Sequence, residues 1–407
     1  MAQTSHTHSH GFKLIFAIPA LLMICGVALA FRPGSFPLLG PDEPRYCEVA
    51  REMYDSGDWI TPNLAGIHWF EKPALAYWLI ATGYSIGGVS ETSARIPLAV
   101  FSAFGIFILF WFGCRIESGR LGYLGASVLA SSGIWIAFSR AATFDLPLSV
   151  SVEIALLAFF LWFREGSWKW WLISCFGMGL AVLAKGLVGI VLPGMAIVVV
   201  LILTRRIWSF LRHPVWIALG ALVFLATAAT WYGPMFLRHG HEFFQEFFVA
   251  HHFQRFLTNK YHHPQPFYFF TMVLFAGCFP WTLFLGASAW SGLRNWKQLL
   301  SGKDPLDLLL WIWIITFVGF FSISTSKLTG YILPAFPAAR PAAGGAGTAA
   351  PRAAKAILRA GCPAAAAHAP ARAPARSPPP CAGRPAAAAR WWGRPVSARR
   401  AAARLPR

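Results

Sequence analysis

Long apolar stretches separated by short polar ones dominate the pattern of hydrophobic and polar positions along the chain. A helix needs roughly 20 mostly apolar residues to cross a bilayer, and runs of about this length recur. They lie near residues 12–31, 92–114, 120–139, 144–163, 170–184, 186–204, 214–232, 267–291 and 307–323, and a tenth run begins near Tyr331. The pattern predicts an all-α fold, a polytopic transmembrane helix bundle.

Residues 32–91 contain no apolar run of this length and combine polar with shorter apolar segments. Tyr46, Val49, Ala50 and Met53 recur at the spacing of one helix face, while charged side chains occupy the other face. The later stretch PALAYWLIATGYSIGG is apolar but too short to span a bilayer. We therefore expect interfacial helices in a long first loop.

The composition agrees with a membrane protein. Of the 407 residues, 56% are hydrophobic and only 13% are charged, whereas soluble domains carry about 25% charged residues. The 19 Trp and 35 Phe suit aromatic belts at two bilayer interfaces. The net charge of +19 falls to +6, with 22 basic and 16 acidic residues, when residues 338–407 are left out. The basic charge alone therefore does not indicate a nucleic-acid partner.

The short loops predict the orientation of the bundle. Loops with two or three basic residues alternate with loops that hold one, and the richer set should be cytoplasmic. The richer loops contain Arg115 and Arg120; Arg164 and Lys169; Arg205, Arg206 and Arg212; and Arg294, Lys297 and Lys303. The opposite, external side then receives the unusual polar positions near helix ends, namely Gly40–Pro73, Asp145, Lys185, the 233–266 loop, Lys327 and Tyr331. Ionisable groups at membrane depth are costly and tend to be functional, so we expect an external polar site.

Two aspartates are the first candidates for chemistry at this site. Asp42 lies just before Pro44, and Asp145 lies just before Pro147 at the start of an apolar run. Each could be a site carboxylate or merely the N-cap of its helix. Lys185, between two apolar runs, could be a simple turn residue.

Cations near the same level indicate an anionic partner. Lys72 could pair only with the adjacent Glu71, or it could hold the headgroup of an anionic lipid. Together with Arg255 and Lys327 it would make a site for a lipid phosphate. A divalent ion held by Glu71 with His251 or His252 is a weaker indication, because two separated ligands do not define a metal site.

These residues belong to motifs that resemble a known family. The stretch GPDEPRYCEVAREMYDSGDWITPNLAGIHWFEKPALAYW resembles the first external loop of bacterial C-type-fold membrane glycosyltransferases, which include protein O-mannosyltransferases. The later motifs RAATFDLPL, LAKG, HHFQRF and SKLTGYILP follow in the family's order. The resemblance covers about residues 12–337 and is closest to the lipid A 4-amino-4-deoxy-L-arabinose transferases.

The resemblance implies an inner-membrane enzyme that moves a sugar from undecaprenyl phosphate to lipid A, or to a protein, on the periplasmic face. Asp42 would be the general base or the carboxylate that orients the acceptor, Arg45 would orient Asp42, and Asp145 would be a second carboxylate. Lys72, Arg255 and Tyr331 would bind the lipid phosphate, with Lys327 nearby. Glu71 would occupy a position that is a structural metal site in some members, so a divalent ion is the one cofactor considered. The other partners expected are membrane lipids, and no nucleic acid.

Two other classes of function remain open. A polyprenyl-lipid transporter or flippase would show internal repeats and charges at helix midpoints, whereas here no clear repeat is visible and the charges lie at helix ends. A membrane scaffold without catalysis is the remaining alternative.

The end of the chain differs in kind. Residues 338–407 are a low-complexity tail of Ala, Arg and Pro without hydrophobic periodicity. We hypothesise a shifted reading frame in a GC-rich gene; the alternative is a disordered basic tail. The hypothesis fails if neither other frame of the gene resumes an apolar sequence after Pro337. We accordingly expect a cytoplasmic tail at 1–11, a truncated membrane glycosyltransferase domain at 12–337 and this tail at 338–407.

Overall fold

The computed structural model describes residue 25 and residues 32–247, 265–302, 304–324 and 326–339, all within one compact unit, Met1–Arg352. The first of the runs expected to span, near residues 12–31, lies almost wholly outside the described residues, as do Arg255, His251 and His252. The division into domains at 11 and 337 is not tested and stays a prediction.

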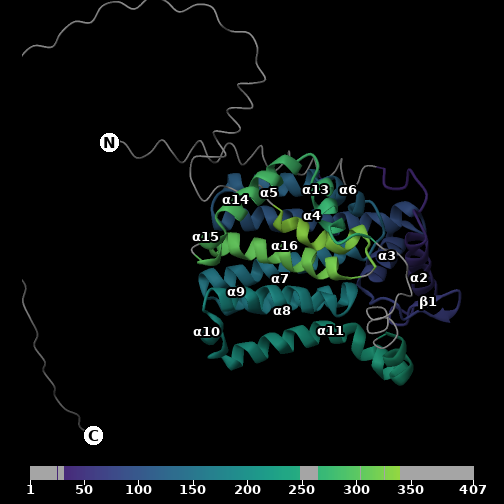
Figure 1. Cartoon of the computed structure of the whole chain (residues 1–407). Helices are drawn as coiled ribbons and strands as arrows, with labels where there is room; N and C mark the ends of the chain where they lie inside the picture. Colours follow the sequence, from purple (N-terminus) through teal and green to yellow (C-terminus); the bar gives the residue numbers. More distant parts are fainter. Residues whose placement is uncertain (1–24, 26–31, 248–264, 303, 325, 340–407) are drawn as a thin grey trace, which may run out of the picture. The chain divides into compact units, whose positions relative to one another are not determined.

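The described residues are almost entirely helical, as expected (Figure 1). One two-stranded hairpin, β1 (Asn63–Leu64) and β2 (Ile67–His68), interrupts them. The α-helices are α2 (Asp42–Ser56), α3 (Leu75–Gly87), α4 (Glu91–Ile116), α5 (Gly119–Ser131), α6 (Gly133–Ser139), α7 (Asp145–Glu165), α8 (Trp168–Lys185), α9 (Val188–Leu203), α10 (Ile207–Leu211), α11 (Pro214–Phe243), α13 (Phe269–Gly277), α14 (Thr282–Arg294), α15 (Trp296–Leu300) and α16 (Pro305–Ile323). A 3₁₀ helix, η2, follows at Thr329–Ala338.

Four described helices are long and apolar enough to cross a membrane, namely α4, α7, α11 with its continuation to Phe247, and α16. The pair α5 and α6, bent by 66°, adds a fifth candidate. The chain is therefore a multi-pass membrane protein with an all-α fold.

Two of the expected spans have a different form. The apolar run at 267–291 is broken between α13 and α14, where Pro280 lacks a backbone N–H. The segment that begins near Tyr331 is the 3₁₀ helix η2 rather than the start of an α-helix, and it contains Pro334 and Pro337. Both corrections have the same cause, because proline interrupts a helix that hydrophobicity alone would continue.

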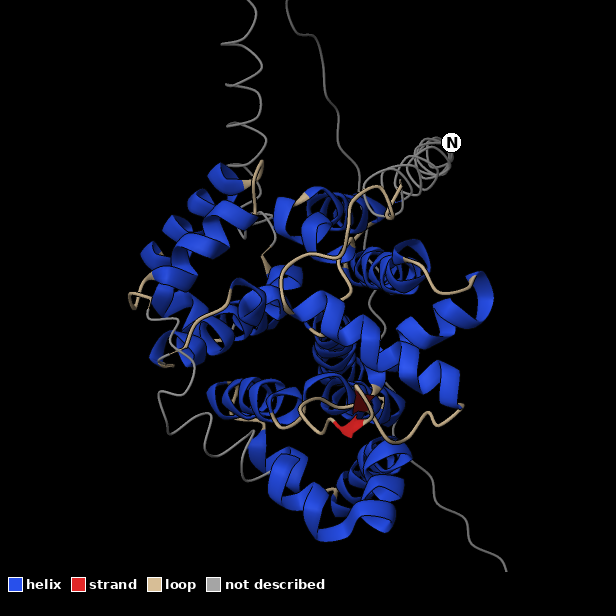
Figure 2. Cartoon of the chain, turned by 90° about the vertical axis from the view of Figure 1, so that its right-hand side faces the viewer, coloured by secondary structure: helices blue, strands red, loops and turns tan. Residues whose placement is uncertain are grey.

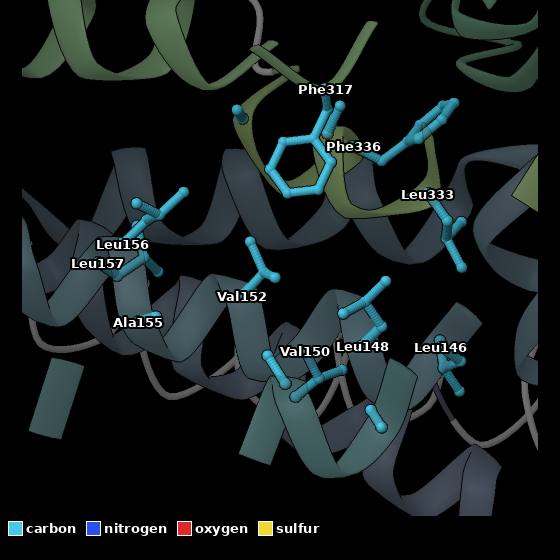
Figure 3. Packing of buried hydrophobic residues seen from close by; sticks show 14 of the residues in the cluster. Leu146, Leu148, Val150, Val152, Ala155, Leu156, Leu157, Phe317, Leu333 and Phe336 are labelled. Carbon is cyan, nitrogen blue, oxygen red and sulfur yellow. The ribbon is translucent and has the colours of Figure 1, made fainter. Parts of the chain in front are cut away.

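Helix α7 is the centre of the bundle. In its most apolar stretch, 94% of the residues are buried inside the protein. Its Leu148 and Val152 face Phe317 of α16 and Leu333 and Phe336 of η2 (Figure 3). A helix that is hydrophobic all round belongs in such a core. The packing fixes both ends of α7, including Asp145 at its start.

The basic loops share one end of the bundle, as the sequence predicts. Arg115 binds Glu165 with an Nε–Oε1 distance of 2.9 Å, and Arg164 donates to the carbonyl of Ile116. Arg206 donates to the carbonyl of Phe163 and lines a cavity of about 530 Å³ there. Helices α10 and α15 lie at this end in Figure 1, and α2, β1 and α3 lie at the other.

The first loop covers that other end, which faces the viewer in Figure 2. Helix α2 buries Tyr46, Val49, Ala50 and Met53, so its predicted amphipathic pattern is confirmed. The β1–β2 hairpin was not expected from the sequence. Its turn is held from α2, because the Glu52 carboxylate accepts hydrogen bonds from the backbone N–H groups of residues 65 and 66.

A buried ion pair ties this loop to the bundle. Glu43 of α2 accepts two hydrogen bonds from the Arg95 guanidinium of α4, at 2.7 and 2.9 Å, and both side chains are almost fully buried. The same carboxylate accepts from the N–H groups of Leu39 and Ala142. Arg95 also donates to three carbonyl groups, those of Pro33, Phe36 and Pro37. Burial alone would raise the pKa of Glu43, but its hydrogen bonds, with Arg95 first, lower that pKa below its ordinary value.

We predict that Glu43→Gln lowers the free energy of unfolding by about 3–5 kcal/mol, because it leaves the Arg95 charge buried and unpaired. Unfolding of the purified chain in detergent measures this. The matched control is Glu48→Gln, whose exposed pair with Arg51 on the same helix should contribute no more than about 1 kcal/mol.

The pH dependence follows from the lowered pKa of Glu43. Its contribution is complete above the ordinary carboxyl pKa of 4.5 and is lost as the pH falls through the lower folded-state pKa. Equal losses for Glu43→Gln and Glu48→Gln would contradict the structural role of this pair.

Candidate functional site

Helix α2 places Asp42 and Arg45 one turn apart at the end of the bundle that the first loop covers. The Arg45 guanidinium lies 3.5 Å from the Asp42 carboxylate, whose side chain is 53% exposed. The helix begins at Asp42 itself, after Pro41, and no side chain caps it. The capping role considered for Asp42 is therefore wrong, and its carboxylate remains accessible to a substrate.

Glu71 and Lys72 follow the β1–β2 hairpin and lie against α2. Glu71 bridges two cations, with Arg45 at 3.6 Å and the Lys72 ammonium at 3.1 Å. Both side chains are mostly buried, with 11% and 14% exposed. The Arg45 guanidinium also lies over the Trp69 ring, 5.6 Å from its centre. Asp42 and the Glu71–Lys72 pair are thus joined through Arg45.

The second half of the site comes from α7, α8 and η2. The carboxylate of Asp145, the first residue of α7, pairs with the ammonium of Lys185, the last residue of α8. No side chain caps α7, so the capping role considered for Asp145 is also wrong. The Lys185 ammonium lies 4.6 Å from the centre of the Tyr331 ring, which belongs to η2. Three segments far apart in sequence therefore meet at Asp145.

Gly330 permits this close approach of η2. A Cβ atom at this position would lie only 2.3 Å from Oδ2 of Asp145 and 2.8 Å from the Phe138 ring. Any larger residue would push η2 away from α7. The motif SKLTGYILP thus needs its glycine so that Tyr331 can reach the Asp145–Lys185 pair.

Tyr46 marks where the two halves face each other. Its ring packs edge-on against Phe144, with centres 4.6 Å apart, next to Asp145 in the chain. Burial raises the pKa of the Tyr46 phenol above its ordinary value, and the negative charges of Asp42, Glu71 and Asp145 raise it further. The three carboxylates therefore all act electrostatically on one buried phenol.

The charges of the site are balanced. Each of the three carboxylates lies beside a cation, and the pairs are Asp42 with Arg45, Glu71 with Lys72 and Asp145 with Lys185. A bound phosphate could compete with a carboxylate for either lysine, which would free that carboxylate. The arrangement can therefore hold an anion beside an accessible carboxylate.

Other predicted residues stand apart from this cluster. In the described part of the chain, the Lys327 ammonium donates to the carbonyl of Ser324 at 2.6 Å, at the end of α16, rather than to Asp145 or Glu71. Arg255 lies outside the described residues. Within the described ranges, the side chains with the spacing of a metal site are His68, His239 and Glu242, and Glu71 is not among them. The metal role of Glu71 stays a prediction, because His251 and His252 lie outside the described residues.

Sequence reasoning missed two partners. It expected Lys185 among the external polar positions or as a simple turn residue and assigned it no partner, although a single lysine between apolar runs is itself an indication of a buried pair. It also missed the Glu43–Arg95 pair, because Arg95 lies 52 residues further along the chain. Nothing in the local pattern joins these two side chains.

Comparisons with known proteins show which proteins the chain resembles. A model of the dolichyl-phosphate-mannose-protein mannosyltransferase family matches residues 71–232. The undecaprenyl phosphate-alpha-4-amino-4-deoxy-L-arabinose arabinosyl transferase of Aeromonas hydrophila is 29% identical over 305 residues, 74% of this chain and 54% of that protein. Transferase 2 of the same description from Sodalis glossinidius is 30% identical over 329 residues, 78% of this chain and 58% of that protein. The chain thus spans a little over half the length of these relatives.

Solved structures give the same result. ArnT from Cupriavidus metallidurans bound to undecaprenyl phosphate superimposes with a TM-score of 0.67 at 30% identity, over 80% of this chain and 58% of that one. Its apo state gives a TM-score of 0.72 at 29% identity, over 87% and 63%. The archaeal oligosaccharyltransferase AglB from Archaeoglobus fulgidus shares the fold at 17% identity, with a TM-score of 0.55 over 86% and 54%. The resemblance is confirmed, and the chain has the C-type glycosyltransferase fold, close to the aminoarabinose transferases.

We predict that Gly330→Ala lowers the free energy of unfolding by about 1–3 kcal/mol, because its Cβ collides with Asp145. The control is Gly319→Ala in α16, where a Cβ meets nothing within 4 Å and a helix gains from alanine. Unfolding of both variants in detergent provides the comparison. If Gly330→Ala is as stable as Gly319→Ala, then η2 does not press against Asp145 as described.

Proposed function

We propose that this chain is the membrane part of a glycosyltransferase that moves 4-amino-4-deoxy-L-arabinose from undecaprenyl phosphate to lipid A, at the periplasmic face of the inner membrane. The single observation that carries the proposal is the charge-balanced cluster of Asp42, Glu71 and Asp145 with their cations at one end of an apolar bundle. The names of the relatives and the bound lipid of the solved neighbour support it.

The position of the cluster suits a donor lipid. A polyprenyl chain would lie in the membrane with its phosphate at the ends of the helices, and Asp145 and Lys185 lie at such ends of α7 and α8. The basic loops lie at the other end of the bundle, and the positive-inside rule assigns that end to the cytoplasm. This orientation supports a periplasmic location for the donor phosphate and the cluster.

The cations assist the departure of the leaving group. When the bond between the sugar C1 and the phosphate oxygen breaks, its electron pair stays on undecaprenyl phosphate. Lys72, Lys185 and the Tyr331 hydroxyl would stabilise that growing charge, together with Arg255. A phosphate is already a good leaving group, so a strong general acid is not needed.

Asp42 acts on the acceptor. The acceptor oxygen forms the new bond to C1, and an acceptor hydroxyl would pass its proton to the Asp42 carboxylate. An acceptor phosphate oxygen of lipid A carries no such proton, and Asp42 would then orient the acceptor through Arg45, which lies 3.5 Å away. The exposure of Asp42 suits an acceptor that arrives from outside the bundle.

Protein O-mannosylation is the second candidate. The family model that matches residues 71–232 is described by that activity, and those residues include Glu71, Lys72, Asp145 and Lys185. The cluster handles the lipid phosphate in the same way in both reactions. The two reactions differ in the acceptor, which is lipid A in one and a protein in the other.

The test replaces Asp42 with asparagine, which keeps the shape but removes the base. We expect Asp42→Asn to lower sugar transfer to lipid A at least about 100-fold, in the range for loss of a general acid or base. Mass spectrometry of lipid A from cells that lack their own transferase measures this. The control is Asp55→Asn, an exposed carboxylate at the far end of α2, which should stay within about twofold of the parent chain.

Three outcomes are informative. Transfer at the parent rate by an equally abundant Asp42→Asn chain would remove its catalytic role. Mannosylated protein with unmodified lipid A would favour the second candidate. Movement of the polyprenyl lipid across the membrane without any sugar transfer would indicate a flippase.

A further inference from the structure

A second group of side chains lies where the β1–β2 hairpin meets α11. His68 of β2 and His239 and Glu242 of α11 each offer one ligand atom, and these atoms lie within 4.8 Å of one another. None of the three takes part in the sugar transfer proposed above. We propose that they form a binding site for a divalent transition-metal ion of the zinc class, which joins the first loop to α11.

The spacing is close to that of a metal site. His68 Nδ1 lies 3.1 Å from Glu242 Oε1. Donor atoms on a tetrahedral zinc ion, each about 2.1 Å from it, are roughly 3.4 Å apart. One pair of ligands is therefore already close to the required distance, and the distances to the remaining donor exceed it by no more than about 1.4 Å.

His239 has a hydrogen-bonding partner outside the proposed group of ligands. Its Nε2 lies 3.0 Å from the hydroxyl of Thr61, a residue that is only 5% exposed. When Nε2–H donates to this hydroxyl, the lone pair of Nδ1 is left for a metal. Such an outer hydrogen bond fixes the tautomer and the orientation of a ligating imidazole.

The surroundings hold the ligands in place without a metal. Gly240 has a φ of 45°, so it breaks α11 between His239 and Glu242 and lets the chain turn there. Arg238 pairs with Asp58 at 2.7 Å, and the indole of Trp231 donates to the carbonyl of Ile60. These contacts attach the loop to α11 on their own, so the site is largely built before an ion arrives.

The choice of ligands indicates the class of ion. Two imidazoles and one carboxylate suit Zn²⁺ and its neighbours, whereas Mg²⁺ and Ca²⁺ prefer oxygen ligands alone. The rings of His68 and His239 meet edge to face with centres 4.7 Å apart, and Phe70 packs on both. An ion here would fix the end of the hairpin at His68, three residues before Glu71, and would thus help to position Lys72.

The experiment uses the full chain, purified in detergent, with His6, His8 and His10 of the N-terminal segment replaced by alanine so that they do not bind metal. Co²⁺ is titrated first, because its visible absorption reports four-coordinate binding, and Zn²⁺ is then added to displace it. We expect one equivalent of Co²⁺ to bind. His239→Ala and Glu242→Gln should each weaken binding at least tenfold.

The matched control is His241→Ala. His241 lies between the proposed ligands in sequence but faces Gln245, 3.2 Å away, and it should leave the affinity unchanged. Glu242 is exposed, so Glu242→Gln should fold as the parent does. A rise in the unfolding temperature with Zn²⁺ in the parent, absent in Glu242→Gln, would be an independent sign of the site.

Two results would overturn the proposal. If the parent chain shows no saturable binding, then His68 and Glu242 form only an ion pair. If binding is equally tight in His239→Ala and Glu242→Gln, then the metal lies elsewhere in the chain. Neither result depends on sugar transfer, so the failure of this proposal and that of the proposed function can be told apart.

Discussion

The buried Glu43–Arg95 pair is the interaction on which the site depends. It joins α2, α4, the loop at residues 33–39 and the N–H group of Ala142, three residues before Asp145. A charge inside an apolar bundle is costly unless hydrogen bonds satisfy it. Here both partners are almost completely satisfied by several bonds. The pair therefore attaches the start of α2, where Asp42 lies, to the segment that leads into α7 and Asp145.

The cost of an unpaired charge in an apolar bundle also explains why the charged side chains of the cluster are paired. In an apolar surrounding, each carboxylate of the cluster has a cation beside it, and each such pair lies at a helix end or in the first loop. These pairs are less buried than Glu43–Arg95, and Asp42 is half exposed. The inner pair therefore supports the structure, whereas the proposed function needs the outer pairs to exchange partners with a substrate. The degree of burial separates the Glu43–Arg95 pair from the pairs of the cluster more clearly than the types of residue do.

The sequence was informative where the physics is local. The length of an apolar run predicted α4, α7 and α16, and the helical period predicted the buried face of α2. Short basic loops correctly predicted which helix ends lie together. The prolines at 280, 334 and 337 were visible in the sequence too, but the prediction of membrane spans relied on hydrophobicity alone. The spans predicted near 267–291 and from Tyr331 therefore had the wrong form.

Contacts between distant residues could not be predicted. Asp145 and Lys185 are 40 residues apart, and no periodicity relates them. The motif resemblance identified Asp42, Lys72, Asp145 and Tyr331 without indicating that Tyr46 lies among three carboxylates. It also gave no reason for Gly330, which the close approach to Asp145 supplies. Motifs therefore identified most of the residues, and packing explained their arrangement.

The central claim is that the cluster binds the phosphate of a polyprenyl lipid. Its most direct test is the affinity of the purified chain for undecaprenyl phosphate, measured for Lys72→Gln and for Lys169→Gln, an exposed lysine at the opposite end of the bundle. Since Lys72 lies in the cluster, its replacement should weaken binding about tenfold or more, which corresponds to about 1.4 kcal/mol. Lys169→Gln should bind as the parent does. Equal affinities of the two variants, or no saturable binding by the parent chain, would contradict the account.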